Sequence, residues 1–144
     1  MEAHSRGRRK DWHTPLSKLR GVGFVSLTDG RSFGGLSIVF GGDYPEEQNE
    51  RYCFKWTDFC AYRNTLEEHR LPWDLEQERS PSGATNMVED SQWISELREG
   101  NDLLEMLQPN LKHYVIGNSS YQTEVISNTE PEIIKLECKL SPPN

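Results

Sequence analysis

Apolar and polar residues alternate along several stretches of the chain with the period of two that is typical of half-buried β-strands. The alternation is clearest over residues 51–56, where aromatic residues occupy every second position. Two apolar runs, 22–27 and 36–40, flank a segment that contains Asp-Gly, and this favours a hairpin because glycine accepts the positive φ of a tight turn. Residues 112–117 and 121–126 are rich in aromatic and β-branched side chains and flank a polar turn, which predicts a second hairpin.

Two further segments show helical spacing. Residues 58–69 follow a polar N-cap and place apolar positions on one face, so we predict a short helix there. A longer helix is predicted from Asp90 or Ser91 to Pro109, with apolar residues that recur on one side and Gly100 weakening its middle by about 1 kcal/mol. After Pro131, the apolar residues at 133, 134 and 136 predict either a short helix or an edge strand.

These elements predict an α+β fold, in which one domain has a mainly antiparallel sheet with two or three helices packed on it. We expect residues 1–20 to be a basic, flexible N-terminal arm and residues 21–140 to be the domain. Within the domain, residues 74–88 lack apolar rhythm and are predicted to be a long loop. Residues 141–144 form a tail with two prolines. At 144 residues the chain has the length of a single domain.

Composition argues for an intracellular protein without a cofactor. No window approaches the roughly 18 apolar residues of a membrane span, and the N-terminus lacks the apolar region of a signal peptide, so we expect no membrane association and a cytoplasmic location. Three cysteines, an odd number, lack Cys-x-x-Cys spacing and a matching histidine cluster, so neither a metal site nor a disulfide framework is predicted. We expect Cys53, Cys60 and Cys138 to be buried free thiols.

Charge is unevenly distributed along the chain. The first twenty residues carry six basic and two acidic groups, whereas the rest carry ten basic and twenty-one acidic groups. An acidic body repels phosphate backbones and attracts basic proteins, so we expect a basic protein partner and no nucleic acid. The candidate partner-binding residues lie in two acidic stretches and are Glu46, Glu47, Glu50, Asp74, Glu76 and Glu78.

No catalytic motif is present, since the chain lacks Gly-x-Ser-x-Gly, His-Glu-x-x-His, a Walker loop and a dinucleotide-binding glycine pattern. The second hairpin nevertheless brings His113 and Glu124 onto neighbouring strands, where they form either an acid–base pair or an exposed ion pair. The exposed ion pair is favoured because no nucleophile or metal-ligand set accompanies them in the sequence. We therefore predict no catalytic residues.

Between residues 54 and 134 the predicted order is a strand, an aromatic-led helix, a long acidic loop, a Trp-led helix and a closing hairpin, and its characteristic residues are Trp56, Trp93, His113, Tyr114, Glu124, Val125 and Ile126. In this order and these residues the chain resembles the small single-domain immunity proteins that accompany bacterial toxins. The resemblance implies a non-catalytic protein that binds one toxin tightly and blocks it, with acidic side chains meeting a basic active-site region. The alternatives are a small-ligand-binding or hydrolytic domain, whose aromatic pocket would hold His113 and Glu124, and a structural or regulatory subunit that forms a symmetric dimer. Whether the protein is a monomer or a homodimer stays open.

Overall fold

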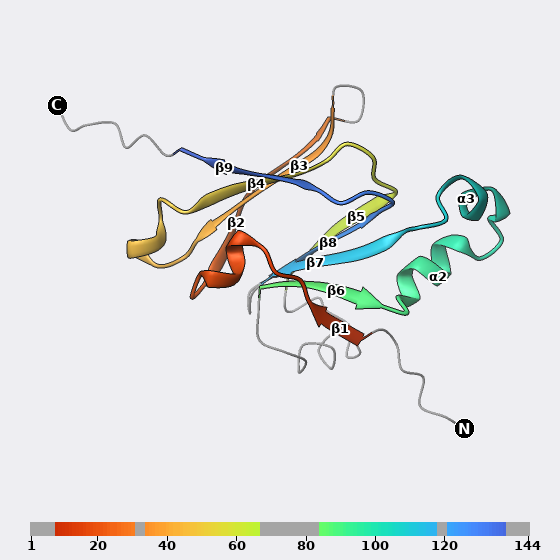
Figure 1. The fold of residues 1–144 in the computed structure, drawn as a ribbon, viewed down its shortest axis with the longest axis horizontal. Coiled ribbons are helices and arrows are strands. Elements are labelled where there is room, and N and C mark those ends of the chain that lie inside the picture. Colours follow the sequence, from red (N-terminus) through yellow and green to blue (C-terminus); the bar gives the residue numbers. More distant parts are fainter. Residues whose placement is uncertain (1–7, 31–33, 67–83, 118–120, 138–144) are drawn as a thin grey trace.

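The computed structural model describes residues 8–30, 34–66, 84–117 and 121–137, and within them nine strands form two antiparallel sheets (Figure 1). The five-stranded sheet has the order β1 (Arg8–Asp11), β6 (Thr85–Glu89), β7 (Lys112–Gly117), β8 (Tyr121–Ser127) and β5 (Ala61–Leu66). The four-stranded sheet has the order β2 (Val22–Gly30), β3 (Gly35–Gly42), β4 (Arg51–Trp56) and β9 (Glu132–Leu136).

The main core lies between the two sheets. Period-two alternation in β4 turns Phe54 and Trp56 inward, and both are fully buried. They meet Tyr114 of β7, whose ring centroid lies 5.6 Å from that of Trp56. Val125 of β8 belongs to the same cluster, so the sheets are joined face to face by large apolar side chains from both. The other buried members are Leu16, Val22, Leu36, Ile38, Phe40, Tyr52 and Ile116.

The basic N-terminal segment contributes to this core. Arg8–Asp11 forms β1 on the edge of the five-stranded sheet, antiparallel to β6. Trp12 follows, and its ring lies 4.9 Å from Tyr114 and 5.7 Å from Phe54 between centroids. A short 3₁₀ helix, η1 (Pro15–Lys18), then buries Leu16 completely. Residues 8–20 of the expected flexible arm are therefore ordered by pairing and packing, and residues 1–7 lie outside the described part of the chain.

Two short α-helices, α2 (Gln92–Arg98) and α3 (Asp102–Leu107), follow β6 and lie beside the five-stranded sheet (Figure 1). A second cluster, in which Ile94, Leu111 and Ile126 are buried, joins α2 to the face of this sheet that points away from the four-stranded sheet. The predicted N-cap is confirmed, because the Ser91 side chain accepts a hydrogen bond from the backbone N–H of Ile94. The predicted single helix to Pro109 is wrong, because Gly100 adopts φ +70° and ends its first half.

The predicted α+β class is wrong. The described residues are nearly all β, with two sheets and only the two short α-helices. The predicted helix over 58–69 is the main error, since Ala61–Leu66 is strand β5 and pairs along its length with β8. The predicted loop 74–88 is also wrong where it is described, because Thr85–Glu89 is strand β6, between β1 and β7. Pairing with distant strands decided both segments.

The strand predictions did better. Both hairpins are confirmed, with Phe24 opposite Phe40 in the first and Tyr114 opposite Val125 in the second. Residues 51–56 form β4, and the segment after Pro131 is the edge strand β9. Cys53 and Cys60 are free but only partly buried, contrary to the expectation of full burial, and Cys138 lies outside the described residues.

Candidate functional site

Strand register gathers charged side chains on one face of the five-stranded sheet. Arg63 of β5 lies directly opposite Glu124 of β8, and Glu124 lies opposite Val115 of β7. His113 is two residues before Val115 and so points to the same face, diagonal to Glu124. The sequence correctly placed His113 and Glu124 on the side away from Tyr114 and Val125, which pack into the core between the sheets.

These side chains form a continuous hydrogen-bonded chain that ends at α2. Ser91 Oγ lies 2.7 Å from His113 Nδ1, and His113 Nε2 lies 2.7 Å from Glu124 Oε1. Arg63 donates to both carboxylate oxygens, from Nε to Oε2 at 2.6 Å and from a terminal nitrogen to Oε1 at 3.1 Å. We call Ser91, His113, Glu124 and Arg63 the polar cluster. Its members come from four separate elements of the chain.

His113 and Glu124 are buried within the polar cluster, so the predicted exposed ion pair is wrong. His113 is 4% exposed and Glu124 is 3% exposed. Trp93 of α2 lies against the cluster, with the Arg63 guanidinium 4.3 Å from its ring centroid and the His113 ring 5.5 Å away, edge to face. The aromatic ring, the helix and the sheet thus cover a pair that alternation alone placed on an open face.

Glu124 is held in its charged form. Burial by itself raises the pKa of a carboxyl group, because the charged form loses its hydration. Hydrogen bonds from His113 and Arg63, together with their charges, outweigh burial and lower the pKa of Glu124 from 4.5 to about 2. An ionised carboxylate only accepts hydrogen bonds, so His113 Nε2 must carry a hydrogen. In the neutral imidazole, Nδ1 then accepts the hydroxyl hydrogen of Ser91.

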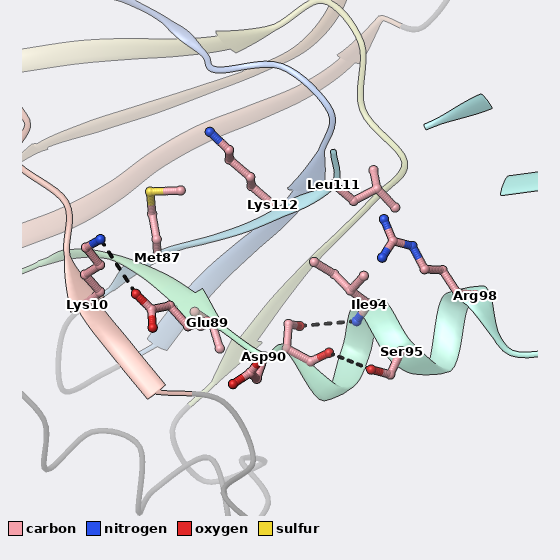
Figure 2. A pocket seen from close by; sticks show the side chains of 11 residues that line it. Lys10, Met87, Glu89, Asp90, Ile94, Ser95, Arg98, Leu111 and Lys112 are labelled. Atoms are coloured by element: carbon pink, nitrogen blue, oxygen red, sulfur yellow. Dashed lines mark hydrogen bonds and ion pairs between the residues drawn. The ribbon is translucent and has the colours of Figure 1, made fainter. Parts of the chain in front are cut away.

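A cavity of about 500 Å³ lies beside the polar cluster, between α2 and the strands β1, β6 and β7 (Figure 2). Ser91 is the member of the polar cluster that lines it. The cavity walls combine aliphatic side chains with basic and acidic ones, and none of the described residues that line it is aromatic. It therefore differs from the aromatic pocket holding His113 and Glu124 that the alternative hydrolytic hypothesis required. The other lining residues are Lys10, Met87, Val88, Glu89, Asp90, Ile94, Ser95, Arg98, Leu111 and Lys112.

The three described candidates for partner binding lie in or just after η2 (Pro45–Glu47), and all have partners within the chain. Glu46 forms an ion pair with Arg20, and Glu47 accepts a hydrogen bond from the Arg20 backbone N–H at 3.1 Å. Glu50 accepts a 2.7 Å hydrogen bond from Tyr52 and lies 3.4 Å from Lys135. Glu46 and Glu50 are thus paired with basic groups, and Glu47 is bound to a backbone N–H. The remaining candidates, Asp74, Glu76 and Glu78, lie outside the described residues.

Helix α3 exposes an apolar surface that includes Leu107, which the helical spacing of the sequence had assigned to the core. Leu103, Met106 and Leu107 are 61%, 77% and 67% exposed, whereas Leu104 packs against the second cluster. Because the chain breaks at Gly100, α3 does not continue the buried stripe of α2. We call Leu103, Met106 and Leu107 the α3 surface.

Sequence reasoning missed Arg63, Ser91 and Trp93 as members or neighbours of the polar cluster. Arg63 was assigned to a helix face and Ser91 only to a cap, and no local signal connects them with His113.

Within the described ranges no group of three His, Cys, Asp or Glu side chains is placed to hold a metal ion. Over the same residues, no helix is long and apolar enough to cross a membrane. No family model, curated protein or solved structure matches the chain.

Proposed function

We propose that this protein is a protein-binding domain that docks a basic partner on helix α3. The observation that supports this function is the exposure of Leu103, Met106 and Leu107 on one two-turn helix. Clustered large apolar side chains on a soluble protein mark interaction sites, because burying them against a partner removes apolar area from water. The α3 surface has the composition of an interface centre, in which leucine and methionine replace charged residues.

The charge around the α3 surface favours a basic partner. Glu99, Asp102 and Glu105 lie on or next to α3, and the helix contains no basic residue. These carboxylates would form an acidic rim around the apolar centre and steer a basic protein toward it. A second copy of the chain would bring the same carboxylates together across a two-fold axis, which opposes the symmetric dimer. An inhibitor that covers the basic active-site region of a toxin is the specific form of this function that the immunity-protein resemblance implies.

Truncation of the α3 surface tests this proposal. In a pull-down from the source lysate, we compare the wild type with Leu103→Ser/Met106→Ser, and then measure the affinity of the captured protein. Both residues are exposed, so we expect the fold to be unchanged and the affinity to fall at least tenfold, which corresponds to about 1.4 kcal/mol. A matched control is Val25→Ser/Ile134→Ser, which changes exposed apolar residues on β2 and β9.

A charge-reversal variant of α3 tests whether the partner is basic. Asp102→Lys/Glu105→Lys should slow association and weaken its dependence on salt, because rim charges act mainly on the association rate. Equal loss of binding in the α3 and control variants would contradict docking on α3. A protein that forms a dimer in solution, and that becomes monomeric in the α3 variant, would replace the basic partner by a second copy of the chain.

A further inference from the structure

We propose that Ser91, His113 and Glu124 form an acyl-transfer centre that hydrolyses small carboxylic esters bound in the cavity beside α2. The three residues are joined by two 2.7 Å contacts, in the order hydroxyl, imidazole and carboxylate. Ser91 also lines the cavity of about 500 Å³, so the residue with the hydroxyl group adjoins a space of ligand size. This activity is independent of partner binding on α3.

Ser91 lies at a sharp turn between a strand and a helix, with an extended backbone of its own (φ −62°, ψ 122°). Strand β6 ends at Glu89, Asp90 turns the chain with φ 53°, and Ser91 caps α2. Asp90 is the one non-glycine residue with positive φ among the residues that the structure describes. A serine at a sharp strand-to-helix turn is held with its hydroxyl in a defined direction. Here the N–H of Ile94 donates to Ser91 Oγ at 3.2 Å and fixes that direction toward His113.

Arg63 holds the carboxylate group of Glu124 in place. Two hydrogen bonds from its guanidinium keep Glu124 ionised and fix the oxygen that receives the Nε2–H of His113. Glu124 thereby selects the tautomer with a free lone pair on Nδ1, the atom that faces Ser91. The two ring nitrogens exchange the positions that they have in chymotrypsin-like triads, while the direction of proton transfer stays the same.

The reaction uses an ester and water only. Ser91 Oγ attacks the carbonyl carbon and forms an acyl bond, while its proton moves to His113 Nδ1. The bond from that carbon to the alcohol oxygen then breaks, and the alcohol leaves with the proton from Nδ1. Water next gives a proton to Nδ1 and attacks the acyl carbon, after which the carboxylic acid departs and the proton returns to Ser91 Oγ.

The cavity lining indicates the kind of ester. In Figure 2, Ile94, Leu111 and Arg98 lie together at the α2 end, and Lys10, Met87 and Lys112 lie at the opposite end. Aliphatic side chains suit a short acyl chain, and basic groups at both ends suit a substrate that carries an anionic group. Lys10 is 3.6 Å from Glu89, and Arg98 donates to the carbonyl oxygens of Gln108 and Pro109. Lys112 is therefore the cation of the lining that has no partner among the described residues.

Fluorophosphonate labelling tests the centre on the wild-type protein. We expect the reagent to modify Ser91, located by peptide mass spectrometry, at least tenfold faster in the folded protein than in 8 M urea. Ser95 is the internal control, because it lines the same cavity but donates its hydroxyl hydrogen to the Ser91 carbonyl oxygen at 3.2 Å. Labelling that is absent, or equal at both serines, would overturn the proposal.

Hydrolysis of 4-nitrophenyl butyrate gives the second measurement. Ser91→Asn removes the nucleophile but keeps a side-chain oxygen for the cap of α2, so the fold is expected to persist. We expect Ser91→Asn and His113→Gln each to lower kcat/KM at least 100-fold, and Ser95→Ala to lower it less than threefold. Equal rates for the wild type and Ser91→Asn would show that the polar cluster only stabilises the fold.

Discussion

The acid sensitivity of this protein should depend strongly on Glu124. The pKa of Glu124 is about 2 in the folded state, against an ordinary value of 4.5. At about 1.4 kcal/mol for each pH unit, the ionised carboxylate contributes about 3 kcal/mol to the free energy of unfolding. The folded pKa is lowered, so this contribution is complete above pH 4.5 and is lost as the pH falls toward 2. Glu124 is 3% exposed, so solvent screening reduces the figure little.

The substitution Glu124→Gln isolates this effect. The variant should be about 3 kcal/mol less stable than the wild type at pH 7, and the two stabilities should converge as the pH approaches 2. Urea unfolding followed by tryptophan fluorescence, repeated at half-unit steps from pH 7 to 2.5, gives both curves. A suitable control is Glu105→Gln, which changes an exposed carboxylate on α3 and should leave the pH profile parallel to that of the wild type. A Glu124→Gln deficit of the same size at pH 7 and pH 2.5 would refute a charge-based role for the carboxylate.

Three further outcomes follow from the packing. Phe54→Ala should lower the free energy of unfolding by about 3–5 kcal/mol in urea titrations, because the ring is fully buried between the sheets. Gly35→Ala should destabilise much more than Gly100→Ala in thermal unfolding, because a Cβ at Gly35 would lie 2.1 Å from the Trp56 carbonyl oxygen, whereas Gly100 faces open space. Burial raises the pKa of Tyr114 from 10 to about 12, so the folded state keeps this proton longer than the unfolded state and loses stability above pH 10. Between pH 10 and 11 the free energy of unfolding should therefore fall by about 1 kcal/mol less in Tyr114→Phe than in the wild type, as measured by the same urea titrations.

The sequence pattern alone predicted a segment correctly where its periodicity matched the burial of its side chains in the fold. Residues 51–56 alternate strictly, and they form β4 with its aromatic side chains in the core. The hairpin of β7 and β8 was predictable for the same reason, as was the N-cap at Ser91. Turn residues, β-branched side chains and capping groups act over a few positions, so one sequence suffices to recognise them.

Segments with ambiguous local preference were decided by distant partners. In Ala61–Leu66, the apolar spacing also fits a helix face, and only pairing with β8 makes the segment a strand. Thr85–Glu89 shows no apolar rhythm, and pairing with β1 on one side and β7 on the other makes it a strand. The polar cluster depends on these two strands, since β5 supplies Arg63 and the end of β6 sets the position of Ser91. The sequence by itself determined the central hairpin and its His113–Glu124 pair. Only the tertiary structure decided that the pair is buried and bound to Arg63 and Ser91. The reason is distance along the chain, because Arg63 is 61 positions from Glu124 and Ser91 is 22 positions from His113.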